Sequence, residues 1–236
     1  MAGITDAEFL KKIIPYGFDV VTLGGYSLDL KTIEASQKII ERGRKEFHFQ
    51  MDEIIPHIEK EVNSIKDFKK EVLVSANVRS AIPEPIIETS KIKGLDIIEV
   101  NCHCRQDEIL AIGCGQEMLK RDDFAEFISQ IVDKSKSKVS VKIRGNVLGI
   151  DTLEIAEIIE SSGADYLHID AMKPGIFDAD YKLIKNVCDN TNINVIGNNS
   201  IDCEDKIEKM ANCGVYGFSI ARAVISSVLN FDISKY

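Results

Sequence analysis

The strongest constraint on how this chain folds is a regular alternation between short runs rich in Val and Ile and longer amphipathic stretches. Short runs that are apolar on both faces are typical of strands buried in a parallel sheet. Seven such runs predict strands at residues 19–23, 72–76, 97–100, 139–143, 166–169, 194–197 and 217–220. Residues 1–4 predict one further strand at the start of the chain.

The stretches between these runs predict helices, because their apolar residues recur at intervals of three and four. Asp151 and Glu154 resemble a capping box, and Gly163 lies where that helix should end. Helices are expected at residues 6–14, 30–42, 51–66, 83–91, 117–135, 151–163, 177–189, 202–214 and 221–229. Residues 43–70 contain no clear strand and are expected to form an elaborated helix or an insertion, not a separate domain.

These β/α units, within 236 residues, favour an α/β fold of the (β/α)8 TIM-barrel type, with residues 1–236 as a single domain. A doubly wound open sheet is the alternative, because it shares the same alternation of strands and helices. With 44% hydrophobic residues the chain is not disordered. Its net charge of −9 argues against binding phosphate backbones over its whole surface.

The sequence predicts a cytoplasmic protein. No run approaches 18 consecutive apolar residues, so no membrane span is expected, and the first residues do not resemble a secretory signal. The six cysteines all follow residue 100 and are not spread like a disulfide framework, so the thiols are expected to be mostly reduced.

In a barrel the active site lies at the carboxyl ends of the strands. Two loops of small residues, 197–200 and 219–222, follow the last two predicted strands and each precede a predicted helix. Main-chain N–H groups and helix ends at such loops favour an anion, and Arg222 would add a charged contact. This pattern predicts a phosphate site; the alternative is an ordinary turn with a solvated arginine.

Two other patterns carry possible chemistry. Lys142 lies inside an apolar run, where an ammonium is costly unless its head reaches the cleft or the solvent. Cys102, Cys104 and Cys114 lack the second distant pair that structural zinc sites use, so no metal is expected. Small buried thiols and a functional thiol both remain compatible with this stretch.

Taken together, these positions resemble the dihydrouridine synthase family, flavin enzymes that reduce uridine in tRNA. Residues 1–6 are similar to the family's Pro-Met-Ala-Gly-Val-Thr-Asp strand. Its Asn-x-Gly-Cys-Pro motif with a later Gly-x-Gly resembles Asn101, Cys104, Gly113 and Gly115. The remaining likenesses are Val-Lys-x-Arg to residues 141–144, Asn-Gly-Asp-Ile to 198–201 and Ile-Gly-Arg to 220–222.

The resemblance implies FMN in the barrel mouth and NADPH or NADH as electron donor. It implies that Cys104 protonates a pyrimidine ring that receives hydride from reduced FMN, while Asn101 orients the base. The cofactor-binding residues that it implies are Ala2 and Gly3 against the ring system, Asn77, Lys142, His168 and Asp170 around it, and Asn198, Asn199, Ala221 and Arg222 at the phosphate.

The sequence departs from the family at two points in the site. His103-Cys104-Arg105 replaces the family's Gly-Cys-Pro, and Asp170 stands where the family has a histidine, with His168 two residues earlier on the same strand face. The chain also stops where the family continues into a helical domain that grips tRNA. A pyrimidine base, in tRNA or as a small molecule, is therefore the expected partner.

Two alternatives stay open at this stage. The dihydroorotate dehydrogenase type of FMN barrel carries a similar Asn-x-Ser-Cys-Pro motif and acts on a free pyrimidine acid. A non-catalytic barrel that binds a phosphate ligand is favoured by Arg105 and Asp170, since changes in catalytic loops accompany lost activity.

Overall fold

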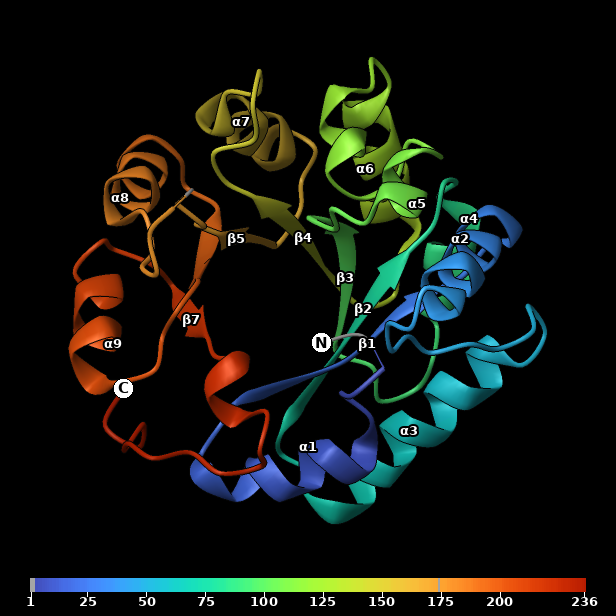
Figure 1. Cartoon of the computed structure of the whole chain (residues 1–236), viewed down its shortest axis with the longest axis horizontal. Coiled ribbons are helices and arrows are strands. Elements are labelled where there is room, and N and C mark those ends of the chain that lie inside the picture. The colour runs from blue at the N-terminus through green and yellow to red at the C-terminus, as the bar shows by residue number, and fades with distance from the viewer. Residues whose placement is uncertain (1–2, 174) are drawn as a thin grey trace.

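The computed structural model describes residues 3–173 and 175–236, which form one parallel sheet surrounded by helices (Figure 1). The seven strands pair in chain order, and each corresponds to one of the Val- and Ile-rich runs. They are β1 Val20–Ser27, β2 Leu73–Arg79, β3 Ile97–Cys102, β4 Lys138–Arg144, β5 Tyr166–Asp170, β6 Asn194–Asn198 and β7 Gly217–Ser219. The sheet curls into a half-barrel, which confirms the predicted α/β fold class.

The helices lie on the outer side of the curled sheet (Figure 1). Aspartates begin several of them: Asp29 forms a capping box with Thr32 of the first turn of the helix that follows it, and Asp151 accepts from the main-chain N–H groups of Leu153 and Glu154. The α-helices are α1 Ala7–Ile13, α2 Leu30–Glu41, α3 Ile54–Phe68, α4 Glu84–Thr89, α5 Asp107–Leu110, α6 Phe124–Lys134, α7 Thr152–Ser161, α8 Tyr181–Asn190 and α9 Glu204–Ala211. Short 3-10 helices are η1 Ile14–Tyr16, η2 Gly115–Lys120 and η3 Arg222–Val224.

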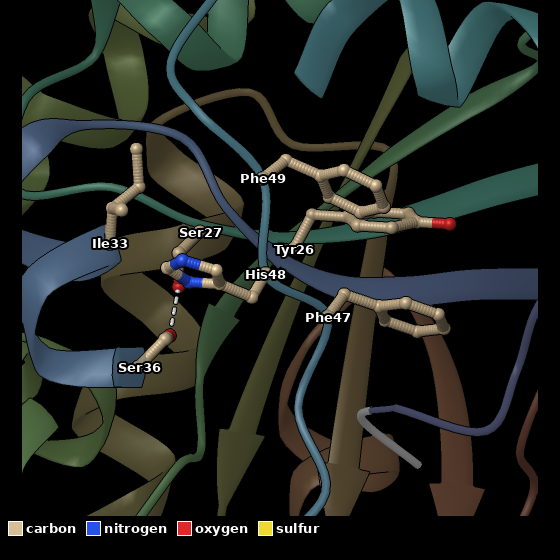
Figure 2. A pocket seen from close by; sticks show the side chains of 7 residues that line it. All are labelled: Tyr26, Ser27, Ile33, Ser36, Phe47, His48 and Phe49. Carbon is tan, nitrogen blue, oxygen red and sulfur yellow. Dashed lines mark hydrogen bonds between the residues drawn. The ribbon is translucent and has the colours of Figure 1, made fainter. Parts of the chain in front are cut away.

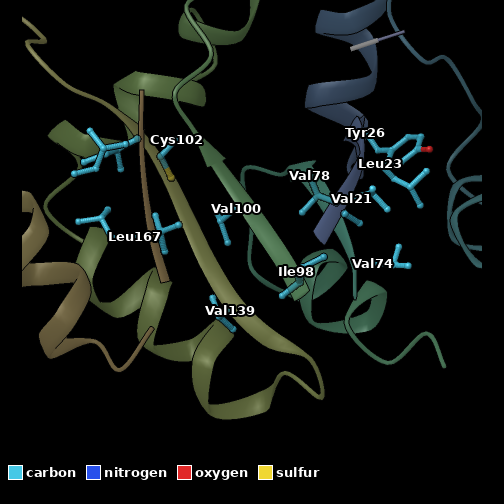
Figure 3. Packing of buried hydrophobic residues seen from close by; sticks show 14 of the residues in the cluster. Val21, Leu23, Tyr26, Val74, Val78, Ile98, Val100, Cys102, Val139 and Leu167 are labelled. Atoms are coloured by element: carbon cyan, nitrogen blue, oxygen red, sulfur yellow. The ribbon is translucent and has the colours of Figure 1, made fainter. Parts of the chain in front are cut away.

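The apolar core lies between the sheet and the helices. Alternate strand residues such as Val74, Ile98, Val100, Val139 and Leu167 are buried in this layer (Figure 3). Because successive residues of a strand point to opposite faces, the residues between them point to the concave side. That side carries polar side chains, and it is where the candidate site is built.

The start of the chain differs from the predicted strand at residues 1–4. Met1 and Ala2 lie outside the described residues, and Gly3 and Ile4 form a turn in which Gly3 has φ +70°. Thr5 makes a single antiparallel bridge to Gly24 of β1. A left-handed residue interrupts extended backbone, so the described residues contain seven strands instead of eight.

Two predicted helices differ from the structure by more than the position of their ends. The segment 117–135 divides into η2 and α6, because Arg121 between them has extended backbone and pairs with Asp123. The segment 221–229 forms only η3, which is followed by Ser227 at φ 63°. Residues 43–70 contain no strand, as predicted: an extended segment precedes α3. Among the described helices, none has the length and apolar character required to span a bilayer.

Candidate functional site

A row of hydrogen-bonded polar side chains crosses the concave side of the sheet. Glu99 of β3 lies 2.7 Å from His168 of β5, measured from Oε2 to Nδ1, although β4 lies between these strands. The His168 Nε2 atom lies 2.7 Å from Ser219 Oγ of β7. Strands that are separated by another strand can bring side chains together in this way only across the inside of the curl.

Lys142 of β4 supplies a positive charge beside this row. Its Nζ lies 3.3 Å from His168 Nε2, and the two residues are register partners in the sheet. Burial disfavours ionisation of Glu99, but the hydrogen bonds that His168 and Asn77 donate and the charge of the Lys142 ammonium outweigh it and hold the pKa of Glu99 well below its usual value. Burial and the charge of Lys142 lower the pKa of His168, so its imidazole is neutral at pH 7.

The row continues to the loop that carries Cys104. Asn77 Nδ2 donates to Glu99 Oε1 at 2.8 Å, and Asn101 Nδ2 donates to Asn77 Oδ1 at 2.8 Å. Asn101 Oδ1 accepts from the main-chain N–H groups of His103 and Cys104 at 3.3 and 3.0 Å. The predicted residues Asn77, Asn101, Lys142 and His168 therefore lie in one connected arrangement next to Cys104.

Gly115 holds the other side of the Cys104 loop. A side chain at this position would place its Cβ 2.3 Å from the Cys104 carbonyl oxygen, so only glycine permits the close approach. The same carbonyl accepts from the Gln116 N–H at 2.9 Å. Cys104 itself is half-buried and packs against a small apolar cluster of Ala35, Ile39, Ile109 and Cys114. The thiol loop is thus fixed from both sides.

The loops after β6 and β7 meet, as the phosphate-site interpretation requires. Arg222 Nη2 donates to Ser200 Oγ at 3.1 Å, and the Lys206 ammonium donates to the Ser200 carbonyl at 2.9 Å. Asn199 and Ser200 have φ angles of 129° and 52°, which are uncommon for residues other than glycine and recur at ligand sites. Ala221 precedes η3 in the second loop and is half-buried.

Asp170, at the end of β5, connects the loop after β6 to β4; the loops after β6 and β7 are called the rim loops below. It pairs with Arg144 at 3.1 Å from Oδ2 to Nη2, and it accepts from Asn199 Nδ2 at 2.7 Å. Burial disfavours its ionised form, but Arg144 and Asn199 outweigh that effect and hold the pKa of Asp170 below its usual value. Asp170 therefore fixes the rim loop instead of presenting a free side chain to the mouth.

Among the predicted cofactor contacts, Gly3 and Asn198 have close neighbours within the chain itself. Ala2 lies outside the described residues. Gly3 packs against the backbone of Lys45 and Glu46, where an added Cβ would approach to 2.8 Å. Asn198 directs its amide to Ser219, donating to the carbonyl at 2.9 Å and to Oγ at 2.6 Å. Its side chain is thus part of the internal row.

Residues 44–49 form a strap beside the ends of β1 and β2. Glu46 of the strap pairs with Arg79 at 2.6 Å, and both side chains are 2% exposed. Phe47 and Phe49 lie near the Tyr26 ring, with centroid distances of 4.9 and 6.5 Å (Figure 2). The space that these residues enclose with Ser27, Ile33, Ser36 and His48 is too narrow to admit a water molecule, so it is packing and not a binding pocket.

The sequence reasoning missed three residues of the site. Glu99 was assigned only to a strand, Ser219 was counted only as part of the small-residue loop 219–222, and His103 was treated only as a departure from a motif. The Nδ1 atom of His103 is buried without a hydrogen-bond partner in the described part of the chain. Glu99 could have been found because it is a charged residue inside an apolar run, as Lys142 and His168 are polar residues inside others. A buried group of this kind needs a hydrogen-bonding partner, which only another strand can supply.

The thiols other than Cys104 do not form a metal site. Burial raises the pKa of Cys114 to about 12 and that of Cys102 further, so both are protonated, apolar packing groups. Within residues 3–173 and 175–236, no cluster of three or more His, Cys, Asp or Glu side chains is arranged to hold a metal ion.

The chain is similar in sequence to a known protein family and to a protein from an archaeon. Residues 50–229 match the dihydrouridine synthase (Dus) family. The uncharacterized protein MJ0144 of Methanocaldococcus jannaschii is 37% identical over 234 residues, which cover 95% of this chain and 87% of that protein.

Solved structures with a similar fold include FabK from Thermotoga maritima, with a TM-score of 0.59 and 10% identity over 96% of this chain. This chain spans 57% of the length of that FabK structure. Phosphoribosyl anthranilate isomerase from Thermus thermophilus has a TM-score of 0.57 at 14% identity, covering 99% of this chain and 90% of the isomerase. At these identities the likeness concerns the TIM-barrel fold alone. The match over residues 50–229 goes further: this chain belongs to the dihydrouridine synthase family.

Proposed function

We propose that this chain is an FMN-dependent oxidoreductase that reduces the C5–C6 double bond of a uracil base. The observation that carries the proposal is the placement of Lys142 beside a neutral His168, in the same hydrogen-bonded arrangement that fixes the Cys104 loop. A cationic group suits an electron-rich ring, and a thiol on a loop fixed by the same arrangement suits a proton transfer. Membership of the dihydrouridine synthase family supports a flavin as the cofactor.

The residues present fit FMN at both of its ends. The rim loops supply Arg222, the Ser200 hydroxyl and main-chain groups at two positions of positive φ, a combination that suits a phosphate. Lys142 supplies positive charge for the anionic reduced ring. The unpartnered Nδ1 of His103 is a buried polar atom that a bound ligand would satisfy.

When bound, reduced FMN supplies a hydride for C6 of the uracil ring. The thiol of Cys104 donates its proton to C5, which leaves a thiolate that solvent reprotonates. Asn101 holds the loop in place through the N–H groups of His103 and Cys104. NADPH or NADH provides the two electrons for the next cycle.

The test begins with FMN binding to the purified chain, measured by flavin fluorescence. Anaerobic reduction with NADPH or NADH follows, and reoxidation is then recorded with tRNA lacking dihydrouridine, with free uracil and with orotate. Reoxidation by tRNA or by a free pyrimidine identifies the substrate class. A chain that binds no FMN would refute the proposal and support a non-catalytic barrel.

Cys104→Ala separates the roles of the site. It should retain FMN and its reduction but lose turnover of the pyrimidine by at least about 100-fold, the usual contribution of a positioned acid. Cys188→Ala, at a half-buried thiol of α8, is the matched control and should leave turnover unchanged. Full turnover by Cys104→Ala would exclude the thiol as the proton donor.

A further inference from the structure

The hydrogen bonds of the polar row have directions that can be derived from its two ends. At one end, the N–H groups of His103 and Cys104 can only donate, so Asn101 Oδ1 must accept and its Nδ2 must face Asn77. Asn77 Oδ1 then accepts, and its Nδ2 donates to Glu99 Oε1. On this side every donor points toward Glu99.

At the other end, the Ser219 carbonyl can only accept, so Asn198 presents its Nδ2 to this residue. The same Nδ2 donates to Ser219 Oγ, which leaves the hydroxyl hydrogen for His168 Nε2. Lys142, which has only donors, also faces that nitrogen. His168 Nε2 is therefore the bare nitrogen of a neutral ring, and Nδ1–H donates to Glu99 Oε2.

Both series of donors end on the same side chain. Glu99 is 4% exposed and receives Asn77 on one oxygen and His168 on the other, with Ser140 Oγ at 3.4 Å from Oε2. Only an ionised carboxylate accepts at both oxygens without donating. An amide of the same shape accepts at one end and donates at the other, so one half of the row would have to reverse.

We propose that Glu99 is the positioning residue of this site. It fixes His168 in the Nδ1–H tautomer, with Nε2 turned toward Lys142, and through Asn77 and Asn101 it holds the loop of Cys104. Its importance for catalysis rests on the proposed function, because only then do Lys142 and Cys104 face a reacting ring. The directions of the hydrogen bonds hold without any ligand.

Nitrogen-15 NMR of the histidine rings tests the tautomer directly in the flavin-free chain. The signals of His168 are identified as those missing from His168→Asn. The wild-type chain should show a protonated Nδ1 and a bare Nε2 at pH 7.5. A ring protonated at Nε2, or at both nitrogens, would overturn the proposal, and this measurement needs no change at Glu99.

Glu99→Gln tests whether the hydrogen bonds from Asn77 and from His168 both depend on an ionised side chain at this position. Either the His168 proton moves to Nε2, or the Asn77 and Asn101 amides reverse and free the loop. In the second case, alkylation of Cys104 by iodoacetamide, followed by peptide mass spectrometry, should accelerate about tenfold, the factor expected for one lost hydrogen bond. If the variant changes neither the tautomer nor the alkylation rate, Glu99 does not position the site.

Glu46→Gln is the matched control, because it also replaces a buried, paired carboxylate by an amide but does not touch the row. It should alter neither readout. FMN binding is measured separately on the wild-type chain. A chain that binds no FMN but shows the Nδ1–H tautomer would refute the proposed function and leave the role of Glu99 intact. A chain that binds FMN but lacks the Nδ1–H tautomer would refute the role of Glu99 and leave the proposed function intact.

Discussion

Replacing Arg79 by Met should destabilise the chain by about 3 kcal/mol, because it leaves the buried Glu46 carboxylate without its partner. The two groups lie 2.6 Å apart with side chains that are 2% exposed, and removal of one member of such a pair costs about 3–5 kcal/mol. The lower end applies because Arg44 Nε stays 3.9 Å from Glu46. The Gly25 carbonyl also loses the hydrogen bond from Arg79.

The expected loss can be measured by urea titration and by thermal melting. For a chain of this length, about 3 kcal/mol corresponds to a fall in the melting midpoint of roughly 6–12 °C. Lys185→Met is the control, since it breaks an ion pair whose side chains are 58% and 54% exposed, and it should leave the midpoint unchanged.

The double variant Arg79→Met with Glu46→Gln tests the stated cause. It removes the buried charge along with its partner, so it should recover at least half of the lost stability. A double variant no more stable than Arg79→Met alone would show that the loss comes from packing. A loss below about 1 kcal/mol for the single variant would refute the buried-pair argument itself.

Three further predictions concern the site. Lys142→Met should weaken FMN binding by about tenfold or more in fluorescence titration, whereas Lys138→Met, on the exposed beginning of the same strand, should not. Arg222→Met should weaken FMN but not riboflavin, since only FMN carries a phosphate; an equal loss for both would place the arginine elsewhere. Burial, followed by the charge of Lys142, lowers the pKa of His103 to about 3, so the unfolded chain takes up a proton between pH 6.5 and 3 that the folded chain does not. The free energy of unfolding should therefore decrease as the pH is lowered through that window, by at most about 1.4 kcal/mol per pH unit for this group. The urea midpoint should be lower at pH 5 than at pH 7.5, and His103→Gln should make this difference smaller. The exposed His48, replaced in the same way, should leave that fall unchanged.

The strands of this fold could be predicted from the sequence because a buried parallel strand needs apolar residues on both faces. Each of the seven described strands overlaps one of the runs rich in Val and Ile, and most of them extend beyond its carboxyl end. In the described part of the predicted strand 1–4, residues 3 and 4 form a turn, because apolar periodicity does not predict the positive φ angle of Gly3. The helix at 221–229 failed for a similar reason, since its ending depends on Ser227.

The site was predictable only where a loop follows a strand. Arg222, Asn199 and Cys104 could be singled out because barrels place such loops together at one end. Glu99 and Ser219 could not, because their importance depends on which side chains face them across the curl. That pairing is set by strand tilt and register, which apolar periodicity does not encode.

The hydrogen-bonded row also bears on how a barrel of this kind can change between species. Each member depends on the direction in which its neighbour donates, so a single substitution leaves a buried group unmatched. The two residues should therefore be kept or replaced together. Relatives that have a carboxylate at the position of Glu99 should have a histidine at the position of His168, and relatives that lack one should lack both. Covariation at these two positions, more than a shared cysteine, would then mark the branch of the family that works as this chain does.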